Sequence, residues 1–139
     1  MSRHRAREAV LVVLFQVDVG NAQPDEAFQR TMDDRSVEGQ DREFAQSAVS
    51  GTLENLHRID EIIKCLSRDW KIERMNRVDR NLMRLALYEI LYRNDIPPSV
   101  AINEAVELAK KYGGADSPRF VNGILGKVAE RLQEFKTGQ

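Results

Sequence analysis

The sequence predicts an all-α protein, with about seven helices in a single domain that spans residues 1–139. Three observations predict this class. Apolar residues recur at helical spacing along most of the chain, no stretch of useful length alternates as a strand does, and aromatic residues make up only 6% of the composition. At 139 residues, with no internal repeat, the chain fits one domain with a sizeable core.

Apolar stripes locate the helices, and glycine and proline separate them. Gly20 ends the first helix, and Pro24 begins the second. Gly51 lies inside a long third helix and weakens it, so it marks either a close crossing or a break. In order along the chain, we expect helices over about residues 6–17, 24–32, 41–66, 78–96, 99–112 and 118–132, with a short turn of helix within 67–76 and a loop over 33–40.

Capping residues place the ends of the two C-terminal helices. Ser99 is expected to cap the first of them, and Gly113-Gly114 to end it. Asp116 is then expected to cap the last helix, with Pro118 at its first position. The stretch from Ile96 to Val128 is therefore predicted to form a helix, a glycine turn and a second helix.

The last predicted helix has an unusual outward face, which combines Arg119 with Gly123 and Gly126. Each interior glycine costs about 1 kcal/mol relative to alanine, so we expect another molecule to approach the backbone closely there. A cation, the flanking aromatic ring of Phe120 and bare backbone near a helix N-terminus suit a phosphate-bearing ligand better than a catalytic reaction.

The composition limits the compartment. A single cysteine, Cys65, cannot form an intramolecular disulfide, so the reducing cytoplasm is the expected location. The longest apolar run, residues 9–15, is too short to span a membrane, and no signal-peptide cleavage site follows it. The net charge of −1 argues neither for nor against a nucleic-acid partner, but segregated charge still permits a basic patch.

The sequence contains no recognisable catalytic or metal-binding motif. His4 and His57 lie far apart and Cys65 has no neighbouring cysteine, so we expect no metal ion, no other cofactor and no enzymatic activity. Most carboxylates have an ordinary explanation as partners of a cation four residues along a helix. Four such pairs are predicted: Asp60 with Lys64, Glu73 with Arg77, Glu89 with Arg93, and Glu107 with Lys111.

Three arginines, Arg3, Arg5 and Arg7, lie in or just before the first turn of the first helix. The helix dipole is positive there, so cations are slightly unfavourable for stability. Two interpretations stay open and evenly balanced. The segment is either a solvated basic start or a set of phosphate contacts, for which the forked guanidinium is suited.

Val12, Phe15 and Gln16 fall on the side of the first helix that faces away from its core stripe. The two apolar side chains are either buried against a second layer of helices or exposed for a partner, and burial is the favoured interpretation. Phe120 presents the same choice in the last helix.

Four motifs make the sequence resemble the NusB family of bacterial transcription antitermination factors over essentially its full length. They are R-x-R-E from Arg5, R-x-A-L-Y-E-I from Arg84, I-P-P-S-V-A-I-N-E-A-V-E-L-A-K from Ile96, and R-F-V-N-G-I-L from Arg119. The last two blocks, in this order and spacing, are highly specific.

The resemblance implies two packed helical subdomains, in the manner of a double three-helix bundle. It also implies binding to the single-stranded boxA element of ribosomal RNA leaders and of other transcripts. The partner would be the small-subunit ribosomal protein that doubles as NusE. With other Nus factors, the heterodimer would help to build an RNA polymerase complex that resists termination.

The same resemblance assigns roles to individual residues. Asp116 matches a position that tunes RNA affinity, Asp79 matches an acidic position at the NusE interface, and Phe15 stands where a tyrosine is common. The arginines and Phe120 would contact phosphates and a base. The full set of expected RNA-binding residues is Arg3, Arg5, Arg7, Phe15, Gln16, Lys110, Asp116, Arg119 and Phe120, with Asp79 as the partner-binding residue.

The two basic elements, residues 3–7 and 110–119, form one site only if the first and last helices pack side by side. With few phosphate contacts and a net charge near zero, the isolated chain is expected to bind RNA weakly and a partner protein to strengthen the binding. Replacement of Arg5 and Arg7 by alanine is expected to lower RNA affinity while the melting temperature stays nearly unchanged.

Two other classes of function stay open. The first is an RNA-modifying enzyme, since a NusB-like domain is also found fused to ribosomal RNA cytosine methyltransferases. Because the sequence given stops at Gln139, we expect no methyl-donor domain. The second alternative is a helical interaction module without an RNA role, such as a homodimer that buries the RNA face.

Overall fold

The computed structural model describes residues 2–67 and 71–137, and these residues form α-helices and one 3-10 turn, with no strand among them. The all-α prediction is confirmed. The elements are α1 (Arg3–Gly20), α2 (Pro24–Asp34), α3 (Gly39–Glu54), α4 (Leu56–Leu66), the 3-10 turn η1 (Ile72–Arg74), α5 (Arg77–Tyr92), α6 (Pro98–Tyr112), α7 (Ser117–Glu130) and α8 (Leu132–Thr137).

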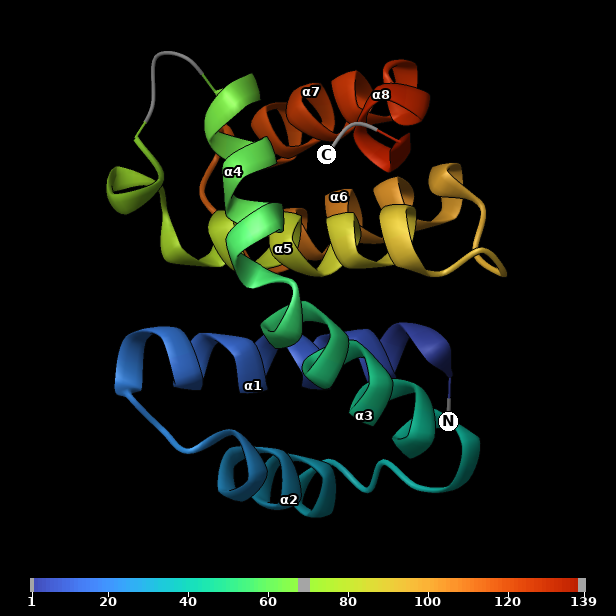
Figure 1. Ribbon diagram of the computed structural model, residues 1–139. Helices are drawn as coiled ribbons and strands as arrows, with labels where there is room; N and C mark the ends of the chain where they lie inside the picture. The colour runs from blue at the N-terminus through green and yellow to red at the C-terminus, as the bar shows by residue number, and fades with distance from the viewer. Residues whose placement is uncertain (1, 68–70, 138–139) are drawn as a thin grey trace.

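The helices form two groups, as expected (Figure 1). Helices α1 to α3 make one group and α4 to α8 the other, with α5 facing α1 across the boundary. Helix α5 packs against α1, α3, α4, α6 and α7. Because helices surround it, every residue of α5 from Asp79 to Ile90 is buried.

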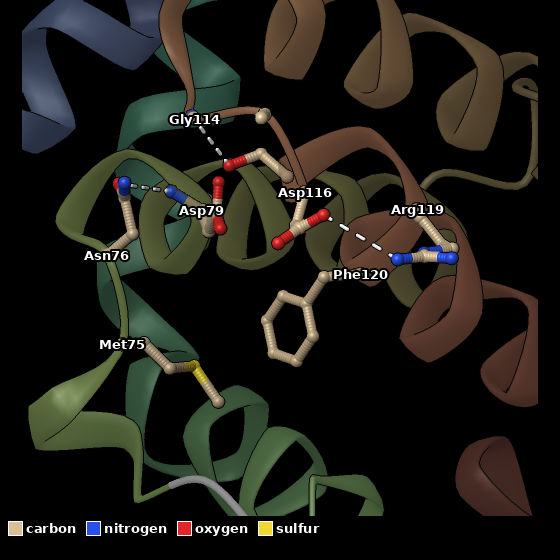
Figure 2. Close-up of a pocket in the computed structure, with 9 residues that line it drawn as sticks. Met75, Asn76, Asp79, Gly114, Asp116, Arg119 and Phe120 are labelled. Carbon is tan, nitrogen blue, oxygen red and sulfur yellow. Dashed lines mark hydrogen bonds and ion pairs between the residues drawn. The ribbon is translucent and has the colours of Figure 1, made fainter.

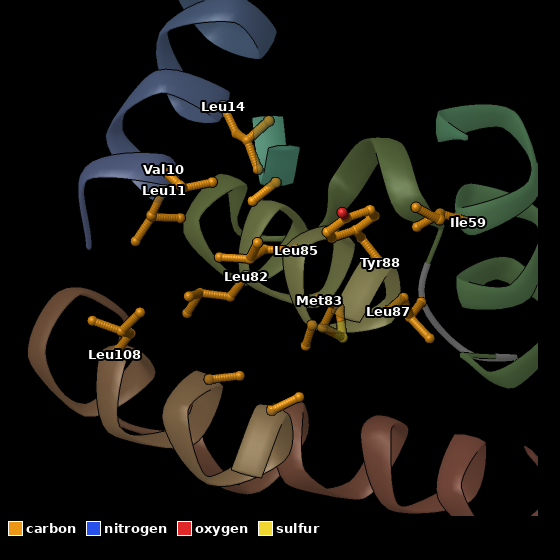
Figure 3. Packing of buried hydrophobic residues seen from close by; sticks show 14 of the residues in the cluster. Val10, Leu11, Leu14, Ile59, Leu82, Met83, Leu85, Leu87, Tyr88 and Leu108 are labelled. Atoms are coloured by element: carbon orange, nitrogen blue, oxygen red, sulfur yellow. The ribbon is translucent and has the colours of Figure 1, made fainter. Parts of the chain in front are cut away.

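One hydrophobic core runs through both groups. Val10 and Leu14 of α1 extend toward the side chains of α5, and Leu82 of α5 extends toward Leu108 of α6 (Figure 3). The two groups therefore share one core, and α1 packs directly against α5.

The long helix predicted over 41–66 is two helices, α3 and α4, which break at Asn55. The side-chain amide of Asn55 donates to the carbonyl of Gly51 at 2.7 Å, and the backbone N–H of Asn55 donates to the same carbonyl at 3.1 Å, so Asn55 caps the last turn of α3. Gly51 itself marks a close crossing, because a methyl group there would collide with the ring of Tyr88. The short turn predicted within 67–76 is η1, although residues 68–70 lie outside the described part of the chain.

Three details of the helix ends differ from expectation. Helix α6 begins at Pro98, so Ser99 lies inside the helix and Pro97 takes the cap position. Asp116 stands at the cap position of α7, but its side chain makes no capping hydrogen bond. The loop expected over 33–40 is shorter, since α2 continues to Asp34 and α3 begins at Gly39.

Candidate nucleic-acid interface

A pocket of about 510 Å3 opens where α5 and α7 begin (Figure 2). One wall comes from the segment that leads into α5 and from its first turn. The other wall is the turn before α7 and the first turn of α7. The lining residues are Met75, Asn76, Asp79, Gly114, Ala115, Asp116, Ser117, Arg119 and Phe120. The pocket therefore brings three of the expected RNA-binding residues together with the expected partner-binding Asp79.

Local hydrogen bonds fix both walls. The side-chain oxygen of Asn76 accepts from the backbone N–H groups of Val78 and Asp79, at 2.8 and 3.3 Å, and so caps α5. At the other wall, the hydroxyl of Ser117 accepts from the N–H of Gly114 at 2.9 Å. A ligand thus meets two helix starts whose geometry is already set.

The carboxylate of Asp79 is buried at the edge of this pocket. Its Oδ1 has no hydrogen-bond partner within the described residues. Burial raises the pKa of Asp79, and a hydrogen bond with Ser117 lowers it only in part. A buried carboxylate oxygen without a donor is costly, so the site suits a ligand that brings a donor or a positive charge.

Arg119 and Asp116 form an exposed ion pair above the pocket. Their closest nitrogen and oxygen atoms are 3.6 Å apart, and both side chains are nearly 90% exposed. Such a pair contributes little stability, so Arg119 is free to exchange the carboxylate for a phosphate. Phe120 is half-buried against the core, and its ring extends into the pocket (Figure 2).

The outward face of α7 is open at Gly123 and Gly126. A methyl group at either position would meet no described atom within 4 Å. Among the described residues, no side chain or helix packs against the backbone of α7 at these glycines. Close approach of a bound partner to this face therefore stays a prediction.

The start of α1 presents two exposed arginines. Arg3 lies over the ring of Phe44, 4.4 Å from its centre, and its Nε is 3.4 Å from Asp41. Arg5 has no ion-pair partner among the described residues. Both guanidinium groups are therefore accessible to an anion.

Arg7 occupies a different position from the one expected. Its side chain is only 6% exposed, and its guanidinium donates to both carboxylate oxygens of Glu89, at 2.9 and 2.7 Å. Glu104 adds a third carboxylate contact at 3.4 Å. Arg7 therefore belongs to an internal ion pair between α1 and α5, and not to a surface that meets phosphates.

The predicted pair of Glu89 with Arg93 is wrong, because Arg93 bonds Asp95 instead.

The two lysines at the end of α6 are also occupied. Lys110 donates to Glu107 at 3.0 Å on the surface of α6, in place of the predicted pair of Glu107 with Lys111. Lys111 donates to Glu8 of α1 at 2.6 Å. The basic corner expected here is thus largely neutralised by neighbouring carboxylates.

A second, mostly apolar groove of about 370 Å3 lies between α1, the start of α5 and the end of α6. Phe15 is 36% exposed and forms one wall, so the favoured expectation that it is buried is wrong. Gln16, beside it, accepts a hydrogen bond from Arg30 at 3.2 Å. The groove is lined by Leu11, Val12, Phe15, Gln16, Val78 and Tyr112.

A single basic site made of residues 3–7 and 110–119 would require α1 and α7 to pack side by side, and they do not. Helix α7 packs mainly against α6 and α5, whereas α1 packs mainly against α2, α3 and α5. The end of α6 reaches α1 instead, through Glu8, Lys111 and Tyr112. Lys111 lies in the basic element expected over 110–119. Glu8 and Tyr112, like Met75 and Asn76 of the pocket, are not among the binding residues expected from the sequence.

The omission of Glu8 and Tyr112 has a common cause. Glu8 stands in the R-x-R-E motif, but its partners lie more than a hundred residues away. Helical spacing puts Tyr112 on the inward stripe of its helix, whereas it is 36% exposed. Pairings across such a distance in sequence follow from packing, which helical spacing alone does not describe.

The described residues hold no group of three or more side chains suited to a metal ion. None of their helices combines the length and the apolar character needed to cross a lipid bilayer.

Comparison with known proteins gives one consistent result. The NusB family model matches residues 4–130. The transcription antitermination protein NusB of Pelotomaculum thermopropionicum is 56% identical over 98% of this chain and 94% of its own length. The solved structure of T. maritima NusB is 38% identical, with a TM-score of 0.88 over 94% of this chain and 92% of that one. A structure of the antitermination factors NusB and NusE in complex with double-stranded RNA is 28% identical, with a TM-score of 0.83 over 94% of this chain and 98% of that one.

Proposed function

The chain belongs to the NusB family, and we propose that it is a transcription antitermination factor that binds the boxA element of nascent ribosomal RNA together with NusE. The observation that carries this proposal is the pocket where α5 and α7 begin. It places an exposed cation and an aromatic ring beside the buried carboxylate of Asp79, whose Oδ1 has no donor among the described residues. One small region therefore offers groups for an RNA strand and for a basic protein.

The proposed RNA-binding surface combines cations, which bind phosphates, with aromatic rings, which stack on bases. Arg3 and Arg5 at the start of α1 and Arg119 on α7 supply exposed guanidinium groups. Phe15 and Phe120 supply the rings. Gln16, Lys110 and Asp116 complete this surface, with Asp116 setting how strongly Arg119 is held by the protein itself. Arg7 is left out of this surface because Glu89 occupies its guanidinium.

The protein half of the proposal centres on Asp79. Its Oδ1 lacks a donor among the described residues, which a lysine or arginine of a ribosomal protein would supply. The protein–RNA pair then joins the RNA polymerase antitermination complex with other Nus factors, in the cytoplasm where transcription takes place. The role is one of binding and assembly, without catalysis.

Fluorescence anisotropy tests this proposal directly. A labelled boxA-like single strand, a scrambled strand and a boxA duplex are titrated with the protein at two salt concentrations, with and without the NusE-type ribosomal protein. We expect weak binding alone, and tighter binding to the boxA strand when the partner is present. Equal binding to the scrambled strand in both cases would reject the proposal. A helical interaction module or homodimer would then be favoured, and sizing at two protein concentrations would detect the homodimer.

A further inference from the structure

Glu8 joins the first helix to the end of α6. Its carboxylate is 8% exposed, and one oxygen, Oε2, accepts from the Lys111 ammonium at 2.6 Å and from the Tyr112 hydroxyl at 2.9 Å. Burial alone would raise the pKa of Glu8, but these two hydrogen bonds, together with the charges of Lys111 and His4, hold the pKa below its usual value. Glu8 is therefore a charged acceptor at neutral pH, and charge-assisted hydrogen bonds of this kind are strong.

A chain of short contacts continues from Tyr112 to the first turn of α7. Tyr112 is the last residue of α6, and Gly113 follows directly. A Cβ at Gly113 would lie 2.5 Å from the hydroxyl of Ser117, so the turn is packed closely against the start of α7. The same hydroxyl accepts from the N–H of Gly114. Tyr112 therefore stands directly before the closely packed turn that leads into α7.

Tyr112 also lines the apolar groove, together with Phe15 of α1. The two parts of the proposed RNA surface, α1 and the start of α7, do not pack directly on one another. Glu8 connects them, because it holds Tyr112 against α1 on one side and the turn before α7 follows on the other.

We propose that Glu8 is a positioning residue for RNA binding, which sets Arg119 and Phe120 of α7 at a fixed distance from Arg3 and Arg5 of α1. This inference rests on the proposed RNA-binding function and goes beyond it. Glu8 acts through Tyr112 and the turn at 113–116 and does not itself touch RNA.

A positioning role and a purely electrostatic role for Glu8 predict opposite changes in RNA affinity, which allows a clear test. Glu8→Gln removes a negative charge beside an RNA surface and releases Lys111, so charge alone would tighten RNA binding. If Glu8 positions the two parts of the RNA surface, Glu8→Gln should instead bind RNA more weakly, because α1 and the start of α7 no longer keep a fixed spacing. Tyr112→Phe removes only the hydroxyl and changes no charge. Glu107→Gln is the matched control, since it also removes one negative charge, but from a side chain that bonds Lys110 on the surface of α6.

The first experiment measures boxA RNA binding by anisotropy for the full chain and these three variants. We expect Glu8→Gln and Tyr112→Phe to bind roughly three- to tenfold more weakly, the effect of removing about one hydrogen bond. The slope of log affinity against log salt should become shallower for both. Glu107→Gln should bind no more weakly than the unchanged chain. Unchanged or tighter binding by Glu8→Gln, whatever its salt slope, would overturn the proposal.

The second experiment needs no RNA. Hydrogen–deuterium exchange should become faster over residues 113–120 in Glu8→Gln and Tyr112→Phe and stay unchanged in Glu107→Gln. Unchanged exchange over 113–120 in both variants would overturn the positioning role even if the protein binds boxA RNA. Absence of boxA selectivity in the unchanged chain would instead reject the proposed function, while the exchange result would still decide the role of Glu8.

Discussion

Arg7 and Glu89 form a two-pronged ion pair in the interior, with Nε and one terminal nitrogen of the arginine donating at 2.9 and 2.7 Å. Arg7 comes from α1 and Glu89 from α5, so the pair joins the two helical groups across their shared core. Glu104 of α6 lies 3.4 Å from the same guanidinium. The arginine-rich start of α1 therefore divides by function: Arg7 holds the fold, while Arg3 and Arg5 face solvent.

Arg7→Ala should destabilise the protein strongly. It leaves the carboxylate of Glu89 buried without its main partner, and removal of one member of a buried ion pair typically costs about 3–5 kcal/mol. Urea or thermal unfolding monitored by circular dichroism measures the change in stability. The control is Arg5→Ala, which should change stability by less than about 0.5 kcal/mol. Equal stability of the two variants would show that the Arg7–Glu89 pair contributes nothing.

Arg5→Ala should weaken RNA binding while the fold stays intact. Removal of one phosphate interaction with a single strand lowers the salt slope by about 0.7, so the plot of log affinity against log salt should become shallower by that amount. Lys64→Ala removes an exposed cation of α4 and is the control, with no change of slope expected. A slope unchanged by Arg5→Ala would remove Arg5 from the RNA surface.

Helical spacing was sufficient to predict the fold class and most helix positions, because each helix has a continuous apolar face. The same reasoning failed for charges. It assigned Glu89 and Asp60 to cations four residues along their own helices, whereas Glu89 bonds Arg7 and Asp60 bonds Arg84. Pairing along one helix applies to exposed faces. Helix α5 is enclosed on all sides, so its charged residues need partners from neighbouring helices.

The candidate site was predicted in part. The R-F-V-N-G-I-L motif led to Arg119 and Phe120, which line the pocket. The exposure of Phe15 could not be predicted, because helical spacing gives the direction of a side chain but not which neighbouring helix covers it. The break at Asn55 could not be predicted either, because the apolar stripe continues across it from α3 into α4.

Gly51→Ala should destabilise the protein even though alanine favours helix. The added methyl group would collide with the ring of Tyr88, and overpacking of a core costs typically about 1–3 kcal/mol. Gly123→Ala is the matched control, because its methyl group would meet open space. That variant should gain up to about 1 kcal/mol from helix propensity. Unfolding measurements should give opposite signs, and a gain for both variants would show that the Tyr88 ring moves aside freely.

Asp79→Lys should weaken the complex with the NusE-type ribosomal protein. It replaces a carboxylate oxygen that lacks a donor by a cation that repels a basic partner. RNA binding by the isolated chain should stay unchanged. Calorimetry of the protein complex and anisotropy with RNA measure the two effects separately, and Glu73→Lys on the exposed turn η1 controls for the change in charge. Full affinity for the partner in Asp79→Lys would refute this assignment.

Asp79→Asn should stabilise the isolated chain at neutral pH. Burial raises the pKa of Asp79 above its unfolded value, so the folded state binds more protons than the unfolded state between the two values. Stability therefore falls as pH rises through that interval, and the full penalty is present above the folded pKa. Asparagine does not titrate, so the variant should melt at a higher temperature than the unchanged chain at pH 7.

The difference should shrink as pH falls toward the unfolded pKa, where the aspartic acid is protonated in both states. Thermal unfolding of both proteins from acidic to neutral pH tests this. A variant that is less stable at pH 7, or a difference independent of pH, would show that the carboxylate is well satisfied in the free protein. In the expected case, the protein keeps a destabilising charge at the edge of its pocket, and a cationic partner relieves that penalty on binding.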